Sequence, residues 1–178
     1  MVEPTESHSH SLVDNMIQVV DNFLDDDSFE ELLIAYSECR MYSAYDYGER
    51  RGGAYYNIQE WIDCYRSDNL KYLFNDITQK IQDELSIKVQ LMTFFKHPAK
   101  TFPTPQLYGM NIPQHIDRNF ERSGVLYMIG GKGLGTTVKD EYVEWKKNRA
   151  IAFDAQTLHN PNFGGVDRIS LTFFGKNA

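Results

Sequence analysis

The sequence predicts an α+β fold in which two helices from the N-terminal part pack on one face of an antiparallel β-sandwich or jelly roll. Two patterns before residue 86 place apolar residues three and four positions apart, as amphipathic helices do. From Ile87 onward, short segments of branched and aromatic residues alternate with turn residues. Such spacing favours antiparallel strands over alternating β and α units.

The chain has 178 residues, which is the length of one domain. We expect residues 16–178 to form that single domain and the polar residues 1–15 to be a disordered N-terminal tail. Hydrophobic residues make up 42% and aromatic residues 13% of the chain, as is typical of a globular protein.

The N-terminal elements are expected in the order strand, helix, helix. A strand is expected at residues 16–23. The acidic residues 25–27 then supply N-cap chemistry for a helix, whose apolar face consists of Phe29, Leu32, Leu33 and Tyr36. A second helix is expected at residues 68–85, and its apolar residues are Leu70, Leu73, Phe74, Ile77, Ile81 and Leu85. Both apolar faces are expected to belong to the core.

Residues 42–66, between these helices, break the helical pattern and are rich in tyrosine and glycine. Long irregular segments in compact domains are often lids or binding loops. The alternative is a pair of aromatic strands joined by a turn at Arg51, Gly52 and Gly53. The sequence leaves both interpretations open.

The C-terminal half is expected to consist of strands that follow one another closely. Strand candidates, recognised by branched and aromatic residues between turn residues, lie at 87–95, 106–112, 123–129, 136–138, 142–146, 149–153 and 168–174.

Charge and cysteine content exclude several classes of partner and compartment. The formal net charge is −7, so we expect no nucleic acid partner, because such binding relies on neutralising phosphates. Cys39 and Cys64 form no Cys-x-x-Cys pair, which predicts neither a disulfide framework nor a thiolate metal site and fits the reducing cytoplasm. Residues 1–11 hold no apolar signal region, and no apolar run approaches about 20 residues, so neither secretion nor a membrane partner is expected.

Three short motifs carry the functional signal. His115-Ile116-Asp117 is followed by Thr157-Leu158-His159 and then by Arg168-Ile169-Ser170. Two imidazoles and one carboxylate are the ligand set that binds a non-haem ferrous ion and leaves one face open for a co-substrate and dioxygen. Arginine is suited to bidentate pairing with a carboxylate, so Arg168 would anchor the far end of a dicarboxylate co-substrate.

The strand period allows these side chains to converge. Residues i and i+2 of a strand point to the same side, so His115 and Asp117 can face one interior. His159 follows an apolar run and therefore lies near a strand end. Arg168 and Ser170 share one side of the last strand by the same period and can both reach into the interior.

The sequence resembles the iron(II)- and 2-oxoglutarate-dependent dioxygenases, and among them the prolyl-hydroxylase-like branch. The resemblance covers most of the chain from about Ile17 onward. It is carried by the segments VVDNFLDDDSFEELL, LYGMNIPQHIDRN, SGVLYMIGG and NRAIAFDAQTLHNPNFGGVDRISLTFFGK.

The resemblance implies a cupin-like double-stranded β-helix with two N-terminal helices and a set of roles for individual residues. His115, Asp117 and His159 match the family's iron ligands, and Arg168 matches its co-substrate anchor. Tyr108 matches the tyrosine that donates to the same carboxylate. Ser170 is added as a third cofactor-binding candidate on the strand period alone.

The implied activity is hydroxylation of a C–H bond with 2-oxoglutarate and dioxygen, with release of succinate and carbon dioxide. Peptidyl proline is the first substrate that the resemblance implies. A free amino acid or other small molecule is an alternative substrate. A zinc or manganese cupin is a further alternative, although it would give Arg168 no clear task. The last alternative is a non-catalytic jelly-roll binding module.

Overall fold

The computed structural model of the chain describes residues 17–43, 64–99, 114–162 and 164–178. Within these residues there are two helices and ten strands. In chain order the elements are β1 (Gln18–Val20), α1 (Asp26–Glu38), β2 (Tyr42–Ser43), β3 (Tyr65–Arg66), α3 (Asn75–Leu85), β4 (Ile87–His97), β5 (Arg122–Ile129), β6 (Thr136–Val138), β7 (Glu141–Val143), β8 (Ala150–Asp154), β9 (His159–Pro161) and β10 (Arg168–Asn177).

The first helix forms where the sequence predicts it. The Asp25 side chain caps α1 by accepting a hydrogen bond from the Ser28 backbone N–H at 2.8 Å. Asp26 and Asp27 in the first turn are favourably placed near the positive end of the helix dipole. Phe29 and Leu32 form the buried face of the helix.

The second helix begins later than predicted, at Asn75 instead of residue 68. The reason lies in residues 67–70, whose backbone hydrogen-bonds to β4. The Ser67 N–H donates to the Phe94 carbonyl at 3.0 Å, and the Leu70 N–H donates to the Met92 carbonyl at 2.7 Å. Leu70 therefore reaches the core from outside the helix, while Leu73 is 69% exposed.

The strands form two antiparallel sheets. The larger has the order β1-β8-β5-β10-β4-β3-β2, and the smaller has the order β7-β6-β9. Strand β10 is central in the larger sheet and pairs with β4 and β5 along most of its length. Both β4 and β10 extend beyond their predicted ends, and β6 has the predicted bounds.

One strand of the smaller sheet was not predicted. Strand β9 pairs with β6, and its sequence, His-Asn-Pro, has no apolar alternation that would identify it. The strand candidate at residues 106–112 lies outside the described residues.

The tyrosine-rich segment is described only at its two ends. Tyr42 pairs with Arg66 and Ser43 pairs with Tyr65, so these ends form the β2–β3 ladder at one edge of the larger sheet. Strand β3 in turn pairs with β4. Residues 44–63 lie outside the described part, and the choice between a lid and an aromatic strand pair stays untested there.

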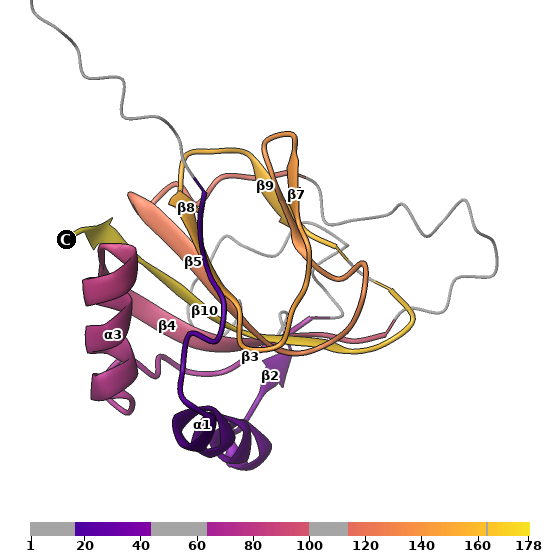
Figure 1. Cartoon of the computed structure of the whole chain (residues 1–178). Coiled ribbons are helices and arrows are strands. Elements are labelled where there is room, and N and C mark those ends of the chain that lie inside the picture. Colours follow the sequence, from indigo (N-terminus) through magenta and orange to yellow (C-terminus); the bar gives the residue numbers. More distant parts are fainter. Residues whose placement is uncertain (1–16, 44–63, 100–113, 163) are drawn as a thin grey trace, which may run out of the picture.

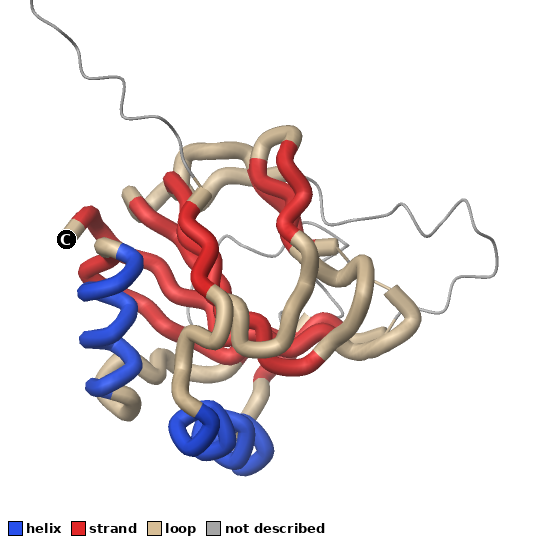
Figure 2. The backbone as a smooth tube through the Cα atoms, viewed as in Figure 1, coloured by secondary structure: helices blue, strands red, loops and turns tan. Residues whose placement is uncertain are grey.

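Two hydrophobic clusters hold the elements together. The larger joins Phe29 and Leu32 of α1 and Ile81 of α3 to residues of the larger sheet such as Phe94 and Leu171. Figures 1 and 2 show both helices on the side of the molecule away from β7 and β9. A second cluster joins the two sheets, and its buried members are Tyr127, Val138, Val143, Ile151 and Phe153. None of the described helices combines the length and hydropathy needed to span a membrane.

Candidate metal centre

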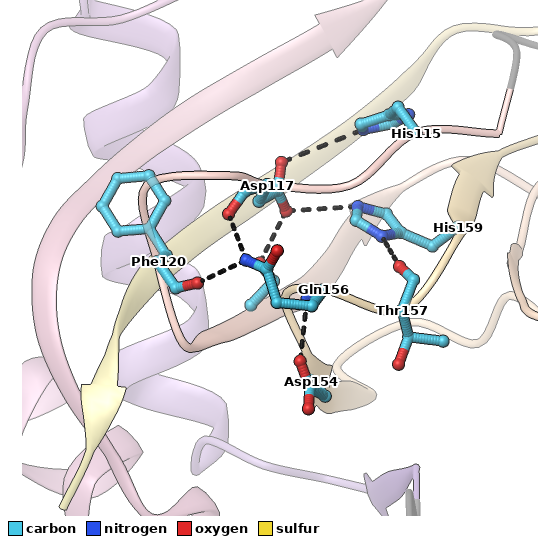
Figure 3. Close-up of polar contacts among 8 residues, drawn as sticks. His115, Asp117, Phe120, Asp154, Gln156, Thr157 and His159 are labelled. Carbon is cyan, nitrogen blue, oxygen red and sulfur yellow. Dashed lines mark hydrogen bonds and ion pairs between the residues drawn. The ribbon is translucent and has the colours of Figure 1, made fainter.

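His115, Asp117 and His159 come together in space. One donor atom from each lies within 4.8 Å of the other two. The His159 Nε2 atom is 3.2 Å from Asp117 Oδ2, and the His115 Nε2 atom is 4.0 Å from Asp117 Oδ1 (Figure 3). The structure thus brings together the three residues that the sequence proposes as metal ligands.

Backbone hydrogen bonds fix this convergence. His115 and His159 face each other in an isolated antiparallel bridge, and each N–H donates to the other's carbonyl at 3.0 Å. The Asp117 N–H donates to the Ala155 carbonyl at 2.8 Å. We expected His115 and Asp117 to lie on one regular strand. Instead, a turn starts at Asp117, and the Phe120 N–H closes it by donating to the Asp117 carbonyl.

The Asp117 carboxyl is buried and oriented by its neighbours. Burial, the largest single effect, raises its pKa, but the hydrogen bond and electrostatic interaction with His159, the Ser123 hydroxyl and the His115 ring together lower it by more. The net effect is a pKa below the ordinary value, so the group is a carboxylate at neutral pH. The Ser123 hydroxyl donates to Oδ2 at 2.6 Å.

The side chain of Gln156 also stabilises the turn that starts at Asp117. Its side-chain N–H group donates to the backbone carbonyls of Phe120 at 3.0 Å and Asp117 at 3.3 Å (Figure 3). Sequence reasoning missed both Ser123 and Gln156. Neither residue stands in a motif, and only the fold brings them next to Asp117.

The tautomer of His159 follows from its hydrogen bond. Nδ1 lies 2.8 Å from the Thr157 carbonyl oxygen, which can only accept, so Nδ1 carries the proton. In a metal-bound state the neutral ring would keep its proton on Nδ1 and offer the Nε2 lone pair to the metal. Such a hydrogen bond from the outer nitrogen is typical of metal-binding histidines.

The donor set fits a divalent transition metal. Two donors at right angles, each about 2.1 Å from an ion, lie about 3 Å apart. The 3.2 Å separation of His159 and Asp117 matches this value, and the 4.0 Å separation of His115 and Asp117 needs only a small side-chain adjustment. Two imidazoles and one carboxylate also leave several coordination positions open.

The three residues open into a cavity of about 590 Å³, measured together with its mouth. Phe153 and Val125 contribute apolar walls. Arg168 lines the same cavity, so a ligand held there can meet both the metal ligands and the arginine.

Arg168 is a buried cation, only 2% exposed. Its Nε–H donates to the Leu134 carbonyl at 2.8 Å, and its Nη2 donates to the Thr136 hydroxyl at 3.1 Å. Its Nη1 lies 3.4 Å from Nδ1 of His97. Burial lowers the pKa of the guanidinium, but an arginine starts so far above neutrality that it remains charged. No carboxylate in the described part of the chain forms an ion pair with Arg168.

Thr136 and Tyr127 complete the surroundings of Arg168. The Tyr127 hydroxyl donates to Thr136 Oγ1 at 2.8 Å, and burial raises the pKa of Tyr127, which keeps this proton in place. Thr136 Oγ1 thus accepts from both Tyr127 and Arg168, and its own proton is directed elsewhere. Because Thr136 lines the cavity, that proton can be donated to a ligand carboxylate. No sequence signal distinguishes Thr136 from the chain's other threonines.

The remaining two predicted site residues are Ser170 and Tyr108. Ser170 is fully buried and pairs with Phe95 and Tyr127 on the neighbouring strands. It is not among the described residues that line the cavity, whereas Thr172, two residues later, is. The expectation that Ser170 reaches the interior space is therefore not met among the described cavity residues. Tyr108 lies outside the described residues.

Comparison with known proteins gives a match in structure only. No family model and no curated protein sequence matches the chain. A 2OG-Fe(II) oxygenase family oxidoreductase from Burkholderia pseudomallei has a TM-score of 0.60 at 13% identity, covering 90% of this chain and 87% of that one.

Two further solved structures extend this match. A Trichoplax adhaerens prolyl hydroxylase, in complex with a hypoxia-inducible-factor oxygen-degradation-domain peptide fragment, has a TM-score of 0.59 at 13% identity and covers 92% and 86%. HygX from Streptomyces hygroscopicus, with nickel, 2-oxoglutarate and hygromycin B bound, has a TM-score of 0.56 at 6% identity and covers 90% and 82%. The chain therefore has the fold of the 2OG-Fe(II) oxygenases, as its sequence resemblance predicts.

Proposed function

We propose that the protein is an Fe(II)- and 2-oxoglutarate-dependent dioxygenase that hydroxylates a C–H bond. One observation carries this proposal: a buried His115–Asp117–His159 cluster and the buried cation Arg168 line the same cavity. A metal-binding cupin without a dicarboxylate co-substrate needs only the cluster. A non-catalytic binding module needs neither.

In this proposal His115, Asp117 and His159 hold the iron. Asp117 is already a carboxylate, and the Ser123 hydroxyl holds it in position. The Thr157 carbonyl keeps the His159 proton on the outer nitrogen. When bound, ferrous iron and 2-oxoglutarate supply the oxidising chemistry, in which dioxygen and the keto acid yield succinate, carbon dioxide and a hydroxylated substrate carbon.

Arg168 and Thr136 hold the far carboxylate of 2-oxoglutarate. The guanidinium donates in charge-assisted hydrogen bonds, and the Thr136 hydroxyl adds its remaining proton. Tyr108, by family resemblance, is a third donor. The apolar walls at Phe153 and Val125 exclude water from the reacting groups.

The double-stranded β-helix is the arrangement that we infer for the two sheets, and residues 16–178 are the single catalytic domain. The substrate is either a peptidyl proline or a small molecule. The Trichoplax enzyme supports the first because its structure contains a peptide fragment, and HygX supports the second because its structure contains hygromycin B.

Anaerobic calorimetry with ferrous iron tests the metal site. His115→Ala and Asp117→Ala should each abolish binding of one ferrous ion, because two remaining ligands do not hold it. His97→Ala is the matched control, since His97 lines the same cavity and is no ligand in the proposal. Parental iron affinity in both ligand variants would refute the assignment.

A further inference from the structure

The turn between β8 and β9, residues 155–158, contacts two of the three candidate metal ligands through its backbone. The Ala155 carbonyl accepts a hydrogen bond from the Asp117 N–H at 2.8 Å. Two residues later, the Thr157 carbonyl accepts from Nδ1 of His159 at 2.8 Å (Figure 3). One short turn therefore helps to set the positions of two ligands that lie far apart in the sequence.

Gln156, between these two contacts, binds the Asp117 segment a second time. Its side-chain N–H group donates to the carbonyl of Phe120 at 3.0 Å and to that of Asp117 at 3.3 Å (Figure 3). These carbonyls belong to the last and the first residue of the turn that the Phe120 N–H closes on Asp117 at 3.1 Å. Because Gln156 bonds to both ends, this turn cannot open without breaking a contact to Gln156.

Asp154, the last residue of β8, holds Gln156 in position. Its Oδ1 atom accepts from the Gln156 backbone N–H at 2.7 Å, and its carbonyl accepts from the Thr157 N–H at 3.0 Å. An aspartate that accepts from the backbone two residues later is a common way to stabilise a turn. Gln156 is exposed to solvent, so its position depends on such hydrogen bonds more than on packing.

Asp117 gains most from this support because its backbone lies outside the ladders of both sheets. His115 and His159 bond to each other in an antiparallel bridge, whereas Asp117 begins a turn. A ligand whose backbone can move loses conformational freedom when a metal binds, and that loss weakens the binding. A turn that is already fixed before the metal arrives avoids this loss.

We propose that Gln156 and Asp154 are positioning residues of the metal centre, which keep Asp117 where its carboxylate can bind the metal. This inference rests on the proposed function. Neither residue is among the described residues that line the cavity, and neither is a ligand in the proposal. Gln156 acts on Asp117 directly, and Asp154 acts through Gln156. Removal of either contact weakens metal binding although all three ligands remain.

Calorimetry of zinc binding to the metal-free protein tests the proposal without turnover, because zinc has no redox chemistry. Gln156→Met keeps the size of the side chain and removes its donor group. Zinc should bind to it about tenfold more weakly, the lower end of the range for losing an outer partner of a metal site. Gln156→Glu should bind more weakly still, because a carboxylate oxygen then faces two carbonyl oxygens.

Gln79→Met is the matched control. Gln79 is also exposed, and its side-chain N–H group donates to Asp83 at 2.8 Å on α3, away from the metal ligands. This variant should retain the parental zinc affinity. Urea unfolding of the metal-free proteins should show similar small losses of stability for Gln79→Met and Gln156→Met, so that the two variants differ in metal binding alone.

Two Asp154 variants test the second positioning residue. Asp154→Asn keeps an oxygen that accepts from the Gln156 N–H and should bind zinc nearly as tightly as the parent. Asp154→Ala removes that oxygen and should bind zinc about tenfold more weakly. Nitrogen-15 spectra of the His159 ring should show a proton on Nδ1 in Gln156→Met, because the Thr157 carbonyl that accepts it is unchanged.

Three results would overturn the proposal. They are equal zinc affinities in Gln156→Met and Gln79→Met, equal affinities in the two Asp154 variants, and a loss of affinity in Gln156→Met that an equal loss of folding stability accounts for. Failure of the proposed metal centre is distinguishable from these. The parent would then bind no zinc, or His115→Ala would bind it as tightly as the parent, and this inference would fall together with the centre.

Discussion

At the scale of single residues, Ser123 holds the carboxylate of Asp117 in the orientation that the candidate metal centre needs. The serine donates one hydrogen bond of 2.6 Å to the buried oxygen that also faces His159. Partners of this kind orient a ligand and reduce the freedom that it loses when a metal binds.

Ser123→Ala should weaken iron binding by about 10–100-fold, the usual cost of removing an orienting partner of a metal ligand. Anaerobic calorimetry measures the affinity. Ser170→Ala is a matched control, because it also removes a buried hydroxyl, but its strand partners are Phe95 and Tyr127 and, within the described part of the chain, it donates no hydrogen bond to Asp117. If both variants bound iron equally well, Ser123 would have only a packing role.

Arg168→Ala should weaken 2-oxoglutarate binding by about 2–5 kcal/mol, the range for removing one member of a buried charge pair. Thr136→Val should have a smaller effect of about 1 kcal/mol, because it removes a single hydrogen bond. Anaerobic titration of the metal-to-ligand charge-transfer band measures both. Iron affinity should stay at the parental value, and an unchanged 2-oxoglutarate midpoint in Arg168→Ala would transfer the anchoring role to another residue.

Part of this site is predictable from the sequence because the chemistry restricts the residue types. Few side chains bind iron, so the order of His115, Asp117 and His159 is informative, and Arg168 adds a fourth constraint. Ser123, Gln156 and Thr136 are common polar residues with no characteristic spacing. Their roles depend on which backbone atoms and side chains the fold places beside them.

At the scale of elements, the packing of β5 against β10 requires a glycine. A Cβ atom added at Gly124 would lie 2.0 Å from Cε2 of Phe173 and 2.7 Å from the backbone oxygen of Ile151. Phe173 is fully buried, so its ring has little room to move.

Gly124→Ala should therefore lower the free energy of unfolding by about 1–3 kcal/mol, the usual cost of overpacking a core. Urea unfolding measures the change. Gly131→Ala is the control, since the atom nearest to its added Cβ is Cγ2 of Val166 at an ordinary 3.9 Å. Equal stability of the two variants would show that the strands separate easily at Gly124.

The element boundaries show where sequence patterns stop being informative. Apolar spacing predicts the body of α3 correctly, yet it also includes Leu70 and Leu73, which precede the helix. The helix starts late because the segment before it is bound to β4. The Asn69 side chain accepts a hydrogen bond from the Met92 N–H of β4 at 3.1 Å. A competing partner that is 23 residues away in the chain is invisible to local periodicity.

At the scale of the whole molecule, the segment between β1 and α1 is bound by hydrogen bonds and ion pairs to the connection between β7 and β8. The Asn148 side chain accepts from the Leu24 N–H at 3.0 Å and donates to the Leu24 carbonyl at 2.7 Å. Asp21 adds ion pairs with Arg149 at 2.6 Å and Lys146 at 2.8 Å. These contacts fix the chain between β1 and α1, which the sequence order alone does not predict.

The Asp21 ion pairs should make stability depend on pH. The hydrogen bond from Arg149, followed by that from Lys146, holds the pKa of Asp21 well below its usual range. In the unfolded chain the Asp21 carboxyl has its ordinary pKa, which is higher than its pKa in the folded protein. Between these two pKa values, the unfolded chain therefore binds more protons than the folded protein. Stability from this group is therefore fully present above the ordinary carboxyl range and is lost as the pH falls toward the folded pKa.

Asp21→Asn should lower the free energy of unfolding by about 1 kcal/mol or less near neutral pH, because the Asp21 side chain is 38% exposed and solvent screens the pairs. The difference from the parent should shrink as the pH is lowered below about 4, where the unfolded carboxyl becomes protonated. Urea unfolding over this pH range measures it. Asp140→Asn, at an exposed turn between β6 and β7, is the control for the loss of one carboxylate from the surface. A difference for Asp21→Asn that stays constant with pH would mean that the asparagine perturbs the turn itself and that the ion pairs contribute nothing measurable to stability.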